Sequence, residues 1–225
     1  MTVSRPCIAF DLDGTLVDTA PDLSAAMNAV LRHFGRREVD AAQVRDMVGH
    51  GARRTIEKGL ALTGGATEAM VDEGQPIFLQ HYADHICDLS RPWDDVESVL
   101  DELSEHAVLA ICTNKPIKLA ESLIAALGWQ DRIAAILGAD SLDVKKPHPR
   151  HLTETIRRAG GSLSRSAYVG DSGTDMKAAR GAGVPSVLVS FGYLDAPIHE
   201  LDADIVIDRF RDLPAALRRV APAIW

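Results

Sequence analysis

Short apolar runs alternate with segments of helical period through the second half of the chain. Leu119, Leu123 and Leu127 recur at helical spacing, and Gly128 follows where that segment ends. Apolar runs of strand length occupy residues 5–10, 108–112, 133–137, 166–169, 186–190 and 205–207. Such alternation favours a parallel sheet that helices cover on both faces.

The stretch between the first two of these strands is different, because every periodic segment in it is helical. Leu23, Met27 and Val30 mark its first helix, with Pro21 in the first turn and Gly35 just past the end. We therefore predict an α/β protein: a Rossmann-like open, mostly parallel sheet, with a small helical domain inserted after the first strand. The predicted α/β core comprises residues 1–16 and 91–225, and the helical domain residues 17–90.

Composition and charge exclude some classes of partner. The chain has 225 residues, 46% of them hydrophobic, and a formal net charge of −8. It has no dense basic stripe and no apolar run near the ~20 residues that span a bilayer, so we expect neither a nucleic-acid nor a membrane partner. Its 3 cysteines are dispersed and odd in number, which favours a reducing, cytoplasmic location.

Polar side chains follow three of the predicted strands where each strand ends. Asp11 and Asp13 follow the first strand, Thr113 and Asn114 follow the strand at 108–112, and the segment GDSGTD follows the strand at 166–169. The carboxyl ends of strands in open α/β sheets are where ligands bind. We expect these three segments to meet in one site.

The carboxylates of this site call for a cation. Asp11, Asp13, Asp171 and Asp175 carry up to four negative charges, and an all-oxygen ligand set suits Mg²⁺ better than Zn²⁺. A phosphate would also find Lys146, which lies in a loop after the strand at 133–137. With the phosphoryl charge neutralised, one aspartate can attack phosphorus, and the aspartate two residues on can protonate the leaving alkoxide.

Four motifs in order resemble those of the haloacid-dehalogenase-like hydrolases: DLDGT at 11–15, TN at 113–114, KP at 146–147 and GDSGTD at 170–175. The resemblance implies that Asp11 is the nucleophile and Asp13 the general acid and base. Thr113 would bind phosphate with its hydroxyl, assisted by Asn114, and Lys146 would stabilise the phosphoryl oxygens. The implied Mg²⁺ ligands are Asp11, the main-chain carbonyl of Asp13, and Asp171, with Asp175 close by. The helical insertion is similar to the family's mobile cap.

Within that superfamily the chain looks most like the phosphoglycolate phosphatases, on the segments VDT at 17–19, VGHGARR at 48–54, KKPHP at 145–149 and VGDSGTDMKAARGAG at 169–183. Trp93-Asp94-Asp95 and Arg150-His151 depart from the usual pattern. Neither departure falls on the expected reacting groups, so they bear on the substrate and leave the chemistry unchanged.

The glycine-flanked loop at 49–51 is the candidate for substrate selection in the cap. Gly49, His50 and Arg53 could present amides or a cation to a substrate carboxylate at a helix N-terminus. The alternative is a helix stop followed by a turn and a solvated basic pair. Two histidine pairs, at 81 and 85 and at 148 and 151, lack a third soft ligand, and we expect them on exposed faces.

These observations favour a Mg²⁺-dependent phosphatase that hydrolyses a small phosphomonoester, with 2-phosphoglycolate the favoured substrate, through an aspartyl phosphate. One alternative is a sugar phosphomutase on the same scaffold. Another, less favoured, is a phospho-aspartate signalling module, which has no use for the inserted domain. The sequence leaves open whether the protein is a monomer or a dimer.

Overall fold

The computed structural model describes residues 5–49 and 51–225 and contains a six-stranded parallel sheet in the order β5-β4-β1-β6-β7-β8. Its strands are β1 (Arg5–Phe10), β4 (Val108–Cys112), β5 (Ile133–Leu137), β6 (Gly161–Gly170), β7 (Ser186–Val189) and β8 (Ile205–Ile207). Each of these falls on one of the apolar runs, and β6 begins earlier than its run. The predicted α/β class with a parallel sheet is confirmed.

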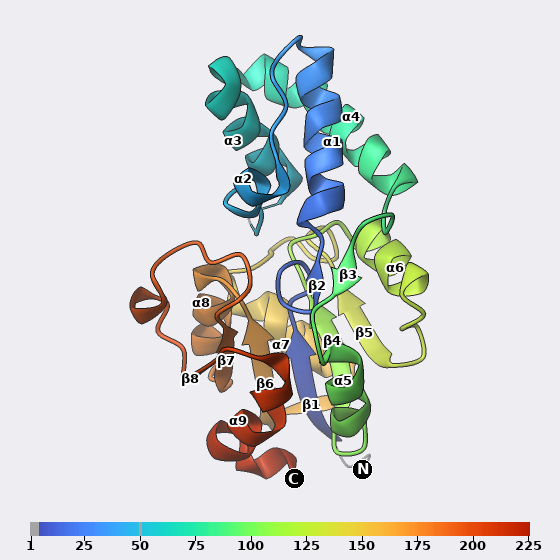
Figure 1. Cartoon of the computed structure of the whole chain (residues 1–225). Coiled ribbons are helices and arrows are strands. Elements are labelled where there is room, and N and C mark those ends of the chain that lie inside the picture. The colour runs from blue at the N-terminus through green and yellow to red at the C-terminus, as the bar shows by residue number, and fades with distance from the viewer. Residues whose placement is uncertain (1–4, 50) are drawn as a thin grey trace.

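Helices cover both faces of this sheet (Figure 1). One face packs against α5 (Val96–Ser104), α6 (Ile117–Ala126) and α9 (Leu213–Val220), and the other against α7 (Pro149–Arg158) and α8 (Gly173–Ala182). The side chains of β1 alternate between the two cores, as the period of a strand requires: Ile8 and Phe10 enter the first, and Cys7 and Ala9 enter the second. Short 3₁₀ helices η1 (Ile198–Glu200), η2 (Phe210–Asp212) and η3 (Pro222–Ile224) complete the C-terminal part.

The segment between β1 and β4 forms a second group of helices beyond the carboxyl ends of the strands (Figure 1). These helices are α1 (Ala20–His33), α2 (Ala41–Arg45), α3 (Ala52–Gly64) and α4 (Glu68–Asp84), and they share an apolar core of their own. We call this group the cap. The capping box of α2, in which Asp40 and Gln43 bond each other's backbone N–H, sets where that short helix begins.

Two chain crossings join the cap to the sheet. β2 (Val17–Asp18) and β3 (Arg91–Pro92) pair there as a small antiparallel ribbon. Beside it, the buried Asp22 carboxylate accepts hydrogen bonds from the backbone N–H groups of Leu89 and Ser90 and from the Ser90 hydroxyl. The beginning and the end of the cap segment are therefore fastened to each other.

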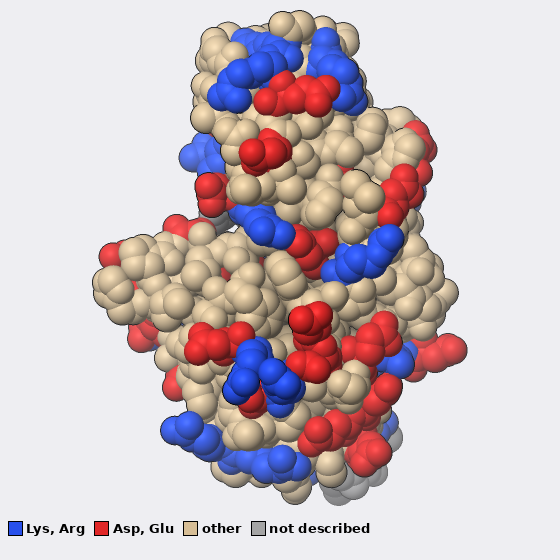
Figure 2. All heavy atoms as spheres, in the orientation of Figure 1, with Lys and Arg blue, Asp and Glu red and all other residues tan. Residues whose placement is uncertain are grey.

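No helix of the described ranges is both long and apolar enough to cross a membrane. The face in Figure 2 carries acidic and basic side chains in separate small groups, with basic groups towards the far end of the cap.

One expectation about the histidines is wrong. His151 is fully buried in α7, where its Nε2 lies 3.0 Å from the carbonyl oxygen of Gly138 and its Nδ1 lies 3.5 Å from the Cys112 sulfur. It shares the buried side of that helix with Leu152, Thr155 and Ile156. Because both ring nitrogens have partners inside the protein, His151 occupies a core position, whereas the sequence predicted an exposed one.

Candidate active site

The carboxyl ends of β1, β4 and β6 bring the motif residues together. Asp11 directly follows β1, Thr113 directly follows β4, and Asp171 directly follows β6. All three are buried, with 5%, 1% and 2% of their surfaces exposed. Gly14 makes the turn after β1 at a φ of 83°, a conformation that glycine adopts without strain. A Cβ at this position would lie 2.2 Å from Asp171 Oδ2, so the site also needs a glycine for space.

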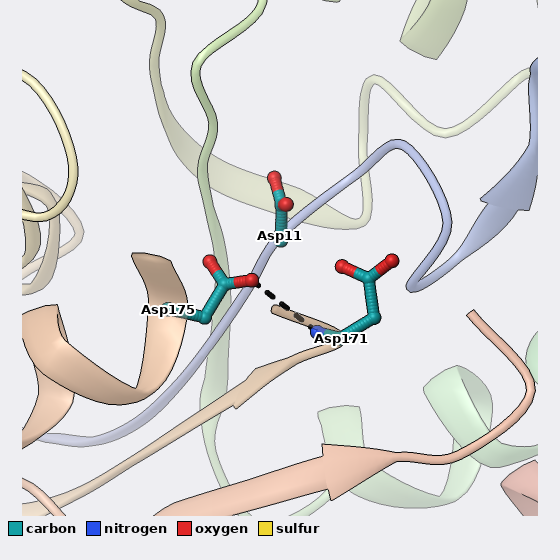
Figure 3. A group of neighbouring side chains, drawn as sticks. All are labelled: Asp11, Asp171 and Asp175. Atoms are coloured by element: carbon teal, nitrogen blue, oxygen red, sulfur yellow. Dashed lines mark hydrogen bonds between the residues drawn. The ribbon is translucent and has the colours of Figure 1, made fainter. Parts of the chain in front are cut away.

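Three buried carboxylates converge at the centre of this site (Figure 3). One oxygen from each of Asp11, Asp171 and Asp175 lies within 4.8 Å of the others. Burial, followed by repulsion from Asp175 and Asp11, raises the pKa of Asp171 well above its usual range. Burial also raises the pKa of Asp11 to about 6, although the nearby Lys146 ammonium opposes the change. A bound divalent cation would relieve this repulsion, and the donors are all oxygen, so the cluster fits Mg²⁺.

Lys146 is the cation that the protein itself supplies to this cluster. Its Nζ lies 2.8 Å from Asp11 Oδ1, 2.8 Å from Asp175 Oδ1 and 3.0 Å from the Tyr168 hydroxyl. Burial opposes the charge of this lysine, but Asp11 and Asp175 outweigh burial and raise its pKa, so the ammonium stays protonated.

Both carboxylate oxygens of Asp175 accept hydrogen bonds from several donors. Its Oδ1 accepts from Lys146 and Tyr168, and its Oδ2 accepts from the N–H groups of Asp171 and Ser172 and from the Ser172 hydroxyl. Burial alone would raise its pKa, but Lys146 and the hydrogen bonds from Ser172 and Tyr168 together lower it. Asp175 is therefore an ionised carboxylate that fixes both Lys146 and the loop that carries Asp171.

Two donors orient Asp171. Thr15 donates its hydroxyl to Oδ1 at 3.1 Å, and the backbone N–H of Tyr193 donates to Oδ2 at 2.6 Å. The Tyr193 hydroxyl in turn donates to Asp18 at the ribbon and accepts from the N–H of Ala20, where α1 begins. One tyrosine thus connects the carboxylate cluster with the entry to the cap.

Asp13 is paired with a lysine that the sequence analysis did not select. Lys115 Nζ lies 2.7 Å from Asp13 Oδ1, and the Thr19 hydroxyl donates to the same oxygen at 2.8 Å. Lys115 also donates to the hydroxyl of Tyr82, on cap helix α4, at 2.6 Å. The signal for Lys115 was its position directly after Thr113-Asn114. Tyr82 fits the apolar period of its helix, and no local pattern separated it from the core residues around it.

Asn114 connects the site to the cap loop. Its Nδ2 donates to the carbonyl oxygens of Gly49 and Lys146, each at 3.2 Å, while its buried Oδ1 has no partner among the described residues. Thr113 accepts from the N–H of Lys115 in a local turn. Helix α6 begins only at Ile117, whose N–H donates to Asp140 Oδ1 at 2.8 Å. Thr113 and Asn114 therefore do not cap that helix.

A pocket lies between the cap and the sheet, and Asp11 is among the residues that line it. Thr113, Asn114 and Gly49 also line it, and their binding to substrate stays a prediction. Arg53 is not among the lining residues, because its guanidinium is engaged with Asp72 and Glu68 on the surface of the cap. His50 lies outside the described residues, and its proposed contact with substrate stays a prediction.

The fold and the site together define a family. Residues 8–189 match the model of the haloacid dehalogenase-like hydrolases, and the chain belongs to that family. The chain is 45% identical to the phosphoglycolate phosphatase of Mesorhizobium japonicum, over 96% of each protein. It is 34% identical to the N-acetylmuramic acid 6-phosphate phosphatase of Pseudomonas aeruginosa, over 94% of each. A crystal structure described as "a predicted phosphoglycolate phosphatase" from Haemophilus somnus 129PT superimposes with a TM-score of 0.87 at 29% identity, covering 96% of this chain and 99% of that one.

Proposed function

We propose that this protein is a Mg²⁺-dependent phosphatase that hydrolyses 2-phosphoglycolate to glycolate and phosphate. The observation that carries the proposal is the placement of Asp11, a buried carboxylate that faces a pocket with Lys146 Nζ 2.8 Å away and two further carboxylates beside it. Relatives that match nearly the whole chain and bear this activity in their names support the choice of substrate.

Asp11 acts as the nucleophile in this proposal. Its carboxylate oxygen attacks phosphorus and the bond to the leaving alkoxide breaks, which leaves an aspartyl phosphate on Asp11. Lys146 and the hydroxyl of Thr113 hold the phosphoryl oxygens, and their donors offset the repulsion between the two anions. Mg²⁺, held by Asp11, Asp171 and the main-chain carbonyl of Asp13, would further neutralise the charge that builds up on the phosphoryl group.

Asp13 moves the protons. It gives a proton to the leaving alkoxide, and then takes one from the water that attacks the aspartyl phosphate. Asp175 contributes by fixing Lys146 and the Asp171 loop, because its two oxygens already accept hydrogen bonds from five donors. We therefore assign it a positioning role beside the metal. We further propose that the enzyme acts on a small metabolite in the cytoplasm.

Steady-state phosphate release from a panel of phosphomonoesters, with Mg²⁺ and with EDTA, tests the proposal. We expect 2-phosphoglycolate to be the most efficient substrate and EDTA to abolish release. N-acetylmuramic acid 6-phosphate belongs on the panel because a relative is named for it. If that sugar phosphate has the highest kcat/KM, the substrate assignment is wrong while the reaction class stands.

Two other functions are separated by different measurements. A phosphomutase would form a phosphate isomer without releasing phosphate. A signalling module would keep its acyl phosphate for minutes, whereas an enzyme with Asp13 beside the intermediate turns it over quickly. A long-lived phosphoenzyme would therefore contradict the assignment of a phosphatase.

A further inference from the structure

Only two charged side chains are among the described residues that line the pocket. Asp11 is one, and Lys115 is the other. Much of the remaining wall is apolar; the cap contributes Leu23, Val48, Phe78 and Leu79 to it. A leaving group that carries an anion needs a cation in such surroundings, because an unpaired charge is costly to bury. Among the described residues that line the pocket, Lys115 is the one that can supply this cation.

The Lys115 ammonium is held by two described partners and has one N–H donor left. Its side chain is 3% exposed, and its Nζ bonds Asp13 at 2.7 Å and Tyr82 at 2.6 Å. An ammonium has three N–H donors, so one remains for a ligand besides these two described partners. The ring of Tyr82 lies beneath the charge, with its centroid 4.3 Å from Nζ, and adds a cation–π contact.

Tyr82 offers a second donor at the same place. Its oxygen accepts from Lys115, and no acceptor for its own O–H is found among the described residues, so that proton can bond an anion. Burial, followed by the charge of Asp13, raises the pKa of this phenol well above its usual range, so it remains protonated. A carboxylate that approaches this corner would meet one N–H and one O–H, the first from the sheet and the second from cap helix α4.

We propose that Lys115 and Tyr82 form the subsite that binds a carboxylate on the leaving group of the substrate. This inference rests on the proposed function and deepens it, because it says how the enzyme distinguishes a carboxylate-bearing phosphomonoester from a neutral one. Arg53, which the sequence suggested for this task, is engaged elsewhere. The subsite also joins core to cap, so binding the carboxylate stabilises the contact between α4 and the loop after β4.

The size of the effect follows from the bonds involved. Charge-assisted hydrogen bonds contribute about 1.5–3 kcal/mol, which corresponds to roughly 10- to 100-fold in binding. A neutral analogue leaves Lys115 paired with Asp13, so no buried charge is orphaned when the carboxylate is missing. We therefore expect the lower part of this range, about 10-fold.

The test compares two substrates that differ only in this charge: 2-phosphoglycolate and its neutral amide, phosphoglycolamide. The ratio of their kcat/KM values is the readout, since a general loss of activity cancels from it. We expect the wild type to favour the carboxylate by about 10-fold or more, Lys115→Met to bring the ratio near one, and Tyr82→Phe to give an intermediate value. Lys115→Arg, which keeps the charge, should retain a preference.

The matched control is Lys145→Met. Lys145 is exposed, and its Nζ would lie 3.6 Å from a Cβ on Gly51 at the same pocket, so it is a competing cation. We expect this variant to keep the wild-type ratio. If Lys145→Met loses the preference, or Lys115→Met keeps it, the inference is wrong.

The same assay separates failure of the subsite from failure of the proposed substrate. A wild type that releases phosphate from both compounds equally well contradicts the subsite and leaves the phosphatase assignment intact. A wild type that releases phosphate from neither contradicts the proposed substrate and the subsite with it. If Lys115→Met does not fold, the kcat/KM ratio of Tyr82→Phe tests the subsite instead, because this substitution removes only the hydroxyl and leaves Lys115 paired with Asp13.

Discussion

Replacing Lys146 by methionine tests the electrostatics of the carboxylate cluster. The substitution keeps most of the buried length of the side chain and removes the ammonium that lies 2.8 Å from both Asp11 and Asp175. Removing one partner of a buried ion pair costs about 3–5 kcal/mol, because the remaining charge is left uncompensated. Against a typical stability of about 5–15 kcal/mol, the metal-free variant should be only marginally folded at pH 8.

The pH dependence gives the sharper signature. The pKa of Asp11 is raised to about 6, above its unfolded value near 3.8, so the folded state binds this proton more tightly. Its ionisation therefore destabilises the metal-free fold as pH rises through that window, and Asp171, whose pKa is also raised, acts in the same direction. The penalty of Lys146→Met should be largest at pH 8 and much smaller at pH 5, where protonation reduces the charge of the cluster.

Urea unfolding in EDTA at both pH values, monitored by circular dichroism, measures this difference. Tyr168→Phe is the milder companion variant: it removes one donor to Asp175 and should cost about 0.5–1.5 kcal/mol. The reasoning is refuted if Lys146→Met changes the free energy of unfolding by less than about 1 kcal/mol at pH 8, or by the same amount at both pH values.

Three further predictions concern residues around the site. Gly14→Ala should weaken Mg²⁺ binding at least about 10-fold by calorimetry, since its Cβ would meet Asp171 Oδ2 at 2.2 Å. Gly35→Ala, with a φ of 63° and open space around it, controls for backbone strain. Equal Mg²⁺ affinity in the two variants would contradict the steric argument. Burial lowers the pKa of His151 from 6.5 to about 4, so the wild type should lose up to about 3 kcal/mol of stability as pH falls through that window; His151→Asn should flatten this slope in urea titrations, and an unchanged slope would count against it. Asp22→Asn should cost about 1–3 kcal/mol by loosening the tether to Leu89 and Ser90, whereas the exposed Asp46→Asn should be neutral; equal unfolding midpoints for these two variants would exclude the tether.

Local patterns predicted the sheet well, because each strand is a short apolar run and segments with helical period separate most of these runs from one another. They also predicted which strand ends meet, since the carboxyl ends of parallel strands share one edge. Asp11, Thr113 and Asp171 could be placed together on that ground alone. The exact boundaries of the two domains remain a prediction.

What escaped prediction depends on contacts between distant segments. Tyr82 is 33 positions from the lysine it contacts, and its helical period is that of a core residue. Tyr193 reaches Asp18 over 175 positions, with no local signal for that bond. His151 was assigned to the surface because its two partners, Gly138 and Cys112, come from other elements. Pairings of this kind are set by how the elements pack together.

The central claim is that a buried carboxylate on Asp11 takes the phosphoryl group from the substrate. Rapid quenching of the wild type with 2-phosphoglycolate labelled on phosphorus, followed by peptide mapping, measures this directly. The account predicts acid-stable, base-labile label on the peptide that contains Asp11, and none in Asp11→Asn. Phosphate release by the wild type with no label on that peptide, or undiminished turnover by Asp11→Asn, would contradict it.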